Sequence, residues 1–176
     1  MRIELEQTIA IAIDYQERLM PVMHERQRLM ENSCILLAGL KELGVPICLT
    51  QQYTRGLGMT IEEITNVAGT TDYIEKISYS AYEELHEALQ GKKYVIVCGI
   101  ESHICVLQTV IDLIEHHYIP VLVTDCITSR KPEDKEMAIQ RASNEGAIIT
   151  TYEAILFELL KKAGSAEAKR IQRIIK

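Results

Sequence analysis

The chain has 176 residues, 47% of them apolar and 25% charged, which fits one soluble globular domain over residues 1–176 and excludes a disordered or fibrous protein. The formal net charge is −6 and no long run of Lys and Arg occurs, so we expect no nucleic-acid partner. The N-terminus lacks the basic and then apolar order of a signal peptide, and no apolar run is long enough to span a bilayer. We therefore expect a cytoplasmic protein without a membrane partner.

Short apolar runs alternate along the chain with longer segments of helical periodicity. We expect strands over residues 8–13, 45–50, 74–77, 93–98, 119–124 and 147–150, and helices over 22–43, 82–90, 103–117, 132–145, 152–162 and 166–175. Residues 51–69 have weak periodicity and should form a loop with a short helix. Because the strand segments are apolar rather than alternating, helices should cover both faces of the sheet. The pattern predicts an α/β fold, a Rossmann-like three-layer α/β/α sandwich with a mostly parallel six-stranded sheet.

The cysteines are odd in number and include no Cys-x-x-Cys pair; they are Cys34, Cys48, Cys98, Cys105 and Cys126. Several lie within apolar stretches. Free thiols in a reducing compartment explain this distribution, and the default interpretation of each cysteine is a small buried apolar residue.

Ligands of doubly wound folds bind at the carboxyl ends of the strands, so polar residues at those ends are the first candidates for function. The candidates are Asp14 after the first strand, Gln51 and Gln52 after the second, Lys76 near the third, residues 99–105 after the fourth, and Asp125 after the fifth.

The segment from Val97 to Val106 (VCGIESHICV) is the most informative. A strand ends at Gly99, a tight turn follows, and a helix begins with Ser102 as the expected N-cap, which puts Cys105 in the first helical turn. There the helix dipole and the unpaired N–H groups favour a thiolate and could hold an oxyanion. The alternative is that Cys105 only packs the helix against the sheet, and the local pattern does not decide between the two.

Other candidates are also open to two interpretations. Asp14 could be a general base or the cap of the following helix, and an isolated lysine such as Lys76 is usually a solvated surface residue. Arg130 could bind a carboxylate as a bidentate fork or simply be exposed. His103 could touch substrate. Asp125 is expected to bond loop backbone.

Three motifs, in this order, resemble those of the isochorismatase-like cysteine hydrolases. They are Asp14-Tyr15-Gln16 after the first strand, a lysine (Lys76) ahead of Tyr79-Ser80-Ala81-Tyr82, and the turn Gly99-Ile100-Glu101-Ser102-His103-Ile104-Cys105-Val106. Their order and approximate spacing match that superfamily across essentially the whole chain. Further stretches resemble its isochorismatase-domain proteins of unassigned substrate; these are Gln51-Gln52-Tyr53 with Gly56-Leu57-Gly58, Thr128-Ser129-Arg130 and residues 171–176.

The resemblance implies a Cys–Asp–Lys triad. Cys105 would attack a carbonyl carbon, Asp14 would take the thiol proton and pass it to the leaving group, and Lys76 would hold the pair and bias its charges. It also implies a cis peptide bond between Ile100 and Glu101, with the N–H groups of Glu101 and Cys105 directed at the substrate oxygen.

The same resemblance makes Gln16, Tyr53 and His103 candidate substrate contacts. Nicotinamidases of the superfamily bind a metal through an Asp-x-His pair and another His, but this chain has no His between His24 and His86. We therefore expect no metal and no cofactor.

The expected reaction is hydrolysis of a small amide or related C–N bond, because a cysteine at the nucleophile position favours attack on an acyl or amidine carbon. Two alternatives stay open: hydrolysis of a vinyl ether without a covalent intermediate, and a catalytically silent binding protein on the same fold. Apolar segments at 147–160 and 171–175, together with the resemblance, predict a homo-oligomer.

Overall fold

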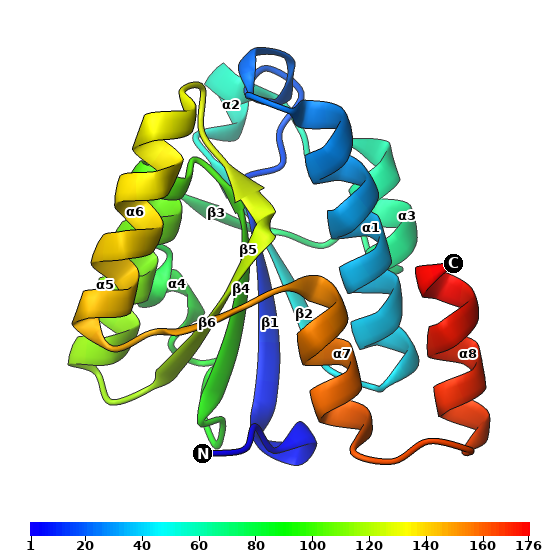
Figure 1. Cartoon of the computed structure of the whole chain (residues 1–176). Helices are drawn as coiled ribbons and strands as arrows, with labels where there is room; N and C mark the ends of the chain where they lie inside the picture. Colours follow the sequence, from blue (N-terminus) through cyan, green and yellow to red (C-terminus); the bar gives the residue numbers. More distant parts are fainter.

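Six parallel strands form one sheet in the order β3-β2-β1-β4-β5-β6, and the computed structural model describes all 176 residues (Figure 1). The strands are β1 (Thr8–Ile13), β2 (Ile47–Gln52), β3 (Ile74–Lys76), β4 (Tyr94–Ile100), β5 (Ile119–Thr128) and β6 (Ile148–Thr150). All pairings are parallel, so every strand has its carboxyl end at the same edge of the sheet.

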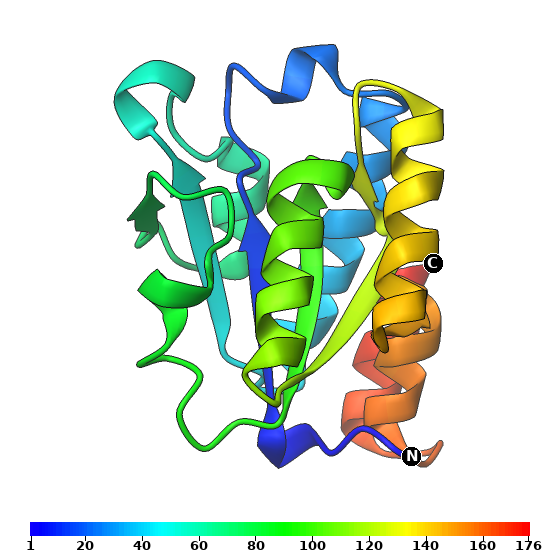
Figure 2. The same ribbon diagram turned by 90° about the vertical axis from the view of Figure 1, so that its left-hand side faces the viewer.

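Helices cover both faces of this sheet (Figures 1 and 2). One face carries α1 (Arg26–Glu42), α3 (Glu62–Ala68), α7 (Tyr152–Leu160) and α8 (Ala166–Ile175); the other carries α4 (Tyr82–Leu85), α5 (Leu107–Glu115) and α6 (Pro132–Glu145). Shorter elements are two 3-10 turns (Leu5–Gln7 and Met20–Val22), α2 (Thr54–Leu57) and a π-helical turn, η3 (Ser102–Val106). None of the helices combines the length and the apolarity that a membrane crossing requires.

Alternation along the central strands supplies two separate cores. In β4, Ile96 and Cys98 enter the core under α1, whereas Val95 and Val97 enter the core under α5. All residues of β4 are buried, which is why its segment is continuously apolar. Each fully buried aliphatic side chain contributes about 1.5–3 kcal/mol to folding, and these contacts fix the sheet beneath the functional edge.

The predicted fold class and the six strands are confirmed, with differences at several boundaries. Strand β2 starts and ends later than expected, so Gln51 and Gln52 belong to the strand rather than to the loop after it. Strand β5 extends to Thr128, beyond the expected end at Thr124. The helix expected over 82–90 is regular only over Tyr82–Leu85. The treatment of residues 1–176 as one independent domain stays a prediction.

The expected N-cap at Ser102 is wrong. Strand β4 continues to Ile100, and the π-helical turn η3 comes between it and α5. The carbonyl of Glu101 accepts a hydrogen bond from the Val106 N–H, five residues on (3.2 Å). Ser102 lies inside this turn, and its buried hydroxyl has no hydrogen-bond partner. The longer strand delays the start of helical winding, so the serine no longer stands before the first turn.

At Gly99 the backbone of β1 leaves no room for a side chain on β4. Its φ is +127°, and a Cβ atom placed there would lie 2.1 Å from the carbonyl oxygen of Ile13. A backbone atom in a central strand cannot move away, so this position requires glycine. The turn that carries Cys105 begins three residues later, at Ser102.

We predict that Gly99→Ala lowers the free energy of unfolding by about 3 kcal/mol or more, because a left-handed backbone penalty adds to a clash with backbone. Gly91→Ala is the matched control, since Gly91 also has positive φ (+74°) but no atom within 4 Å of the added Cβ. That control should lose only about 1 kcal/mol. Equal losses for the two variants in urea denaturation would contradict the role given to the close approach.

Candidate active site

Three of the predicted residues come together at the carboxyl edge of the sheet. Asp14 directly follows β1, Lys76 is the last residue of β3, and Cys105 lies in the turn after β4. They are buried, with exposed fractions of 0%, 1% and 6% respectively. Asp14 adopts a left-handed backbone conformation (φ 54°), which is uncommon for a residue with a side chain.

A buried ion pair joins two of them. The ammonium Nζ of Lys76 lies 2.8 Å from Oδ2 of Asp14, and neither side chain is exposed. The geometry is that of an ion pair without a hydrogen bond, so Oδ2 retains its capacity to accept a proton. The other oxygen, Oδ1, accepts a hydrogen bond from the Thr50 hydroxyl (2.7 Å). Asp14 is therefore not a helix cap, and Lys76 is not a solvated surface lysine.

The N–H donors of Lys76 bond to three other groups. Nζ donates to Oε1 of Gln52 (2.6 Å) and to the carbonyl oxygens of Tyr79 (2.9 Å) and Ser78 (3.3 Å). A buried charge is tolerated when it is both paired and hydrogen-bonded, and Lys76 meets both conditions. Its ammonium is thereby fixed beside Asp14.

The thiol of Cys105 is protonated at neutral pH. Burial raises its pKa, the negative charge of Asp14 raises it further, and the positive charge of Lys76 lowers it, with a net result of about 12. The expectation that the helix start favours a thiolate is wrong for the resting state. Desolvation and the adjacent carboxylate outweigh the lysine, and Cys105 lies in the π turn ahead of α5 rather than in that helix.

Gln52, one of the polar candidates at the strand ends, also belongs to this cluster, although no catalytic or binding role was predicted for it. Its Oε1 accepts from Lys76 and lies 4.0 Å from Sγ of Cys105, so one amide oxygen faces both groups. Its Nε2 donates to the carbonyl of Ile77 (2.6 Å), which fixes the orientation of the amide. The sequence signals for this residue were its place near the end of the second strand and the resemblance of Gln51-Gln52-Tyr53.

Gln16 holds Gln52 in turn. Its Oε1 accepts from the N–H of Gln52 (2.7 Å), and its Nε2 donates to the carbonyls of Gln52 (3.0 Å) and Gly58 (2.8 Å). Gln16 is fully buried, and both polar atoms of its side chain are bonded to backbone. The glutamine of the Asp-x-Gln motif therefore braces β2 against the loop that contains α2.

Tyr53 and His103 lie around this cluster. Tyr53 follows β2, is 51% exposed, and has a left-handed backbone (φ 39°). His103 contacts Ser129 through Nδ1 (2.8 Å) and lies 3.8 Å from Asp134 through Nε2. Contact of either residue with substrate stays a prediction.

The turn after β4 carries the predicted oxyanion residues. The Ile100–Glu101 peptide bond is cis, as the resemblance implies. The Glu101 N–H donates no hydrogen bond within the protein. The Glu101 side chain accepts bonds from both the backbone N–H and Nε of Arg130 (3.1 Å each), so the carboxylate partner of Arg130 is supplied by the protein itself. This pair anchors the turn to the segment after β5.

The histidines and acidic residues do not assemble into a metal site: no three His, Cys, Asp or Glu side chains meet in an arrangement that could hold a metal ion. His116 instead stacks on the ring of Tyr82, with centroids 3.9 Å apart. The five cysteines are all unpaired.

Comparisons with known proteins agree with this architecture. The family model of the isochorismatase domain matches residues 8–154. Isochorismatase domain-containing protein 1 of Danio rerio is 33% identical over 96% of this chain, and the chain spans 61% of the length of that relative.

Solved structures share the fold. MAR1 ribonuclease from Caenorhabditis elegans superimposes with a TM-score of 0.93 at 28% identity, covering 99% of this chain and 92% of that one. The YcaC gene product from Escherichia coli, described as an octameric hydrolase of unknown specificity, has a TM-score of 0.90 at 22% identity, covering 98% of this chain and 90% of that one.

We predict that iodoacetamide alkylates Cys105 more slowly than a small free thiol at neutral pH, because its pKa is raised to about 12. The rate should rise about tenfold per pH unit between pH 8 and pH 10, following the thiolate fraction. Peptide mass spectrometry separates Cys105 from the half-buried Cys34 and Cys48. In Asp14→Asn the carboxylate that raises this pKa is lost, so alkylation should accelerate. A rate plateau below pH 8 in the wild-type protein would contradict the protonated resting thiol.

Proposed function

The chain belongs to the isochorismatase family, within the isochorismatase-like hydrolases, and we propose that it is a cysteine hydrolase that cleaves a small amide or related C–N bond through Cys105, Asp14 and Lys76. The observation that carries this proposal is the buried ion pair between Lys76 and Asp14 beside a buried thiol. Such an arrangement is expensive to maintain and has no evident value for the fold alone.

In the proposed first step, Sγ of Cys105 attacks the carbonyl carbon while the thiol proton moves to Oδ2 of Asp14, the carboxylate oxygen without a hydrogen bond. Deprotonation accompanies attack, because the resting thiol does not ionise at neutral pH. The C–N bond then breaks, and the same proton passes from Asp14 to the leaving nitrogen. An acyl thioester on Cys105 remains.

In the second step, Asp14 takes a proton from water as the oxygen attacks the thioester. The acid leaves, and the thiol is restored when the proton returns to sulfur. Lys76 holds the Asp14 carboxylate in position and balances the negative charge that develops on sulfur or oxygen. The N–H groups of Glu101 and Cys105 are the proposed donors to the oxyanion.

The elevated pKa of Cys105 also favours a second candidate, because a protonated thiol is a weak nucleophile. In that reaction, on a vinyl ether, Asp14 exchanges protons with the substrate and no bond to sulfur forms. A catalytically silent binding protein is the third possibility.

RNA is not proposed as the substrate, although one structural neighbour is named a ribonuclease. The net charge is −6, and the site cation Lys76 is already paired with Asp14. A phosphodiester backbone needs unpaired cations along its path.

We propose a homo-oligomer, on different grounds from those taken from the sequence. The apolar residues of 147–160 and 171–175 are largely used in the core; those fully or almost fully buried are Ile155, Leu156, Leu159 and Ile171. In the first of these segments Ile149 (38%) and Phe157 (41%) remain exposed. Four more exposed apolar side chains lie in the segments that follow β2 and β3, whose last residues are Gln52 and Lys76: Tyr53 (51%), Met59 (45%), Ile77 (70%) and Tyr79 (56%). The octameric E. coli neighbour is consistent with assembly.

We predict that Cys105→Ala loses at least about 10³-fold in kcat on any amide, ureide or ester that the wild-type protein hydrolyses, with the fold retained. Rapid quench and mass spectrometry should detect an acyl adduct on the Cys105 peptide of the wild-type protein. Full activity of the variant would move the assignment to the non-covalent reaction. Absence of turnover across a broad panel that includes vinyl ethers would favour the binding protein.

Gln52→Ala should reduce kcat by about 10–100-fold, since Lys76 loses the acceptor that orients its ammonium. Gln51→Ala is the matched control: Gln51 bonds only to the hydroxyls of Thr54 and Thr60, so kcat should stay near the wild-type value. In Gln52→Glu the added negative charge near Sγ should raise the pKa of the thiol and so move the alkaline limb of the pH–rate profile to higher pH. Equal losses for the two alanine variants would show that Gln52 has only a structural role.

We expect light scattering at micromolar concentration to give a multiple of the 20.0 kDa chain mass. A charged substitution at the most exposed apolar position, Ile77→Glu, should favour smaller species, whereas Met137→Glu, on α6 away from the site, should leave the mass unchanged. A monomer in the wild-type protein would refute the assembly.

A further inference from the structure

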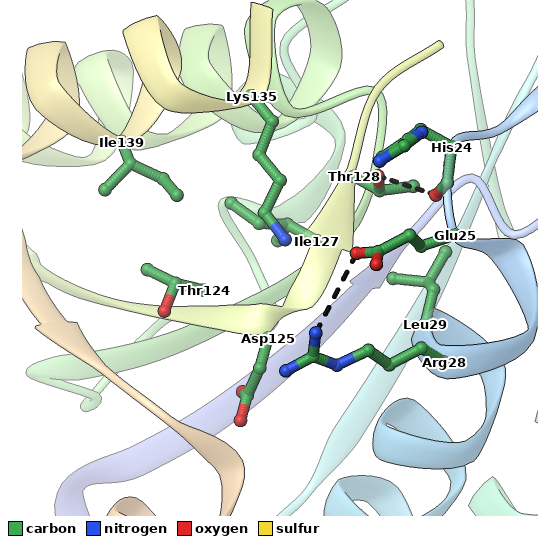
Figure 3. A pocket seen from close by; sticks show the side chains of 10 residues that line it. All are labelled: His24, Glu25, Arg28, Leu29, Thr124, Asp125, Ile127, Thr128, Lys135 and Ile139. Carbon is green, nitrogen blue, oxygen red and sulfur yellow. Dashed lines mark hydrogen bonds and ion pairs between the residues drawn. The ribbon is translucent and has the colours of Figure 1, made fainter. Parts of the chain in front are cut away.

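A cavity away from the buried Asp14–Lys76–Cys105 cluster opens where β5 extends past β6. Strand β6 pairs with β5 only through Val121 to Val123, so the outer edge of β5 has no strand partner from Thr124 to Thr128. Beyond that edge the first turn of α1 and the start of α6 stand apart, and a cavity of about 230 Å³ lies between them. Its lining residues are His24, Glu25, Arg28, Leu29, Thr124, Asp125, Ile127, Thr128, Lys135 and Ile139 (Figure 3).

This cavity is separate from the candidate active site, because Cys105, Asp14 and Lys76 do not line it. Four charged side chains do. In Figure 3 the Lys135 ammonium descends from α6, and the Glu25 carboxylate and the Arg28 guanidinium reach toward the same space from α1. Asp125 lies below Arg28 on β5.

Lys135 is the unusual member of this group. The residue is half-buried, yet its ammonium forms no hydrogen bond and no ion pair within 4.0 Å. Burial lowers the pKa of its ammonium, and the more distant charges of Glu25 and Asp125 only partly oppose this. A cation that loses water without gaining a partner costs free energy that a bound anion would recover.

The other charges are available as well. Arg28 makes one loose contact with Glu25, at 3.9 Å, so most of its guanidinium donors are free. Glu25 has a left-handed backbone (φ 48°), a conformation that persists in side-chain residues mainly where function or packing requires it. Asp125 is held by the Tyr152 N–H through Oδ1 (2.9 Å) and is thereby fixed in position.

We propose that this cavity binds a small zwitterion of the α-amino acid class, with its carboxylate between Lys135 and Arg28 and its ammonium against Glu25 or Asp125. Two cations and two anions line the cavity, so a ligand with one charge of each sign satisfies both without adding net charge. A dianion such as phosphate would be repelled by the two carboxylates. A guanidinium also matches the planar geometry of a carboxylate.

The test is calorimetric titration and thermal unfolding of the full chain with each standard L-amino acid at about 10 mM, far above a micromolar Kd. At least one should bind with a stoichiometry of one per chain and raise Tm by about 3–6 °C once its concentration exceeds Kd about tenfold. The matched carboxylic acid without the amino group, and inorganic phosphate, should bind at least about tenfold more weakly.

Two variants locate the binding. Lys135→Met and Arg28→Gln should each weaken it by at least about tenfold, and either one decides the question if the other fails to fold. Lys131→Met, an exposed lysine outside the cavity, and Cys105→Ala should bind like the wild-type protein.

Any of three results overturns the proposal. These are no binding by any amino acid, equal binding of the deaminated acid or of phosphate, and binding that survives Lys135→Met but is lost in Cys105→Ala. The last result would assign the ligand to the candidate active site instead.

Discussion

The ion pair between Lys76 and Asp14 is the constraint on which the rest of the site depends. Removing two charges from water costs several kcal/mol per ion, and mutual attraction offsets this only when both groups also have hydrogen-bond partners. Here those partners come from β2, from the segment after β3 and from Thr50. Strands β1, β2 and β3 must therefore keep a fixed register, and loss of either charge would leave the other uncompensated at a cost of about 3–5 kcal/mol.

The same burial sets the chemistry available to Cys105. A dry site strengthens the interaction of sulfur with both charges, but it also makes a stored thiolate costly, and the raised pKa reflects that balance. A nucleophile of this kind is activated only when a base receives its proton during attack. The free lone pairs on Oδ2 of Asp14 meet that requirement, while Gln52 and Gln16 keep Lys76 from moving away.

The order of strands and helices could be predicted because apolar runs and helical periodicity are local properties of the sequence. The end of β2 could not, since Gln51 and Gln52 are polar and resemble loop residues until their partners are known. The burial of Lys76 could not be predicted either, because its partner Asp14 is distant in sequence. The π turn at Cys105 was missed because five residues of π and of α winding place apolar side chains almost alike. The left-handed conformation at Asp14 also had no local signal, because that residue type usually signals only a turn or a cap.

Two lysines with little exposure, Lys76 at the end of β3 and Lys135 on α6, differ in their partners and therefore in their roles. The ammonium of Lys76 donates hydrogen bonds to three groups of the protein and forms an ion pair with Asp14. It is therefore not available to bind an external anion. Lys135 is also partly desolvated, but it lies beside the part of β5 that extends beyond β6. No group of the protein pairs with its ammonium there. A satisfied buried cation organises chemistry at its own site, whereas an unsatisfied one favours a ligand. The closed polar cluster forms where β1, β2 and β3 end together, whereas the open charged cavity lies where β6 is too short to accompany β5.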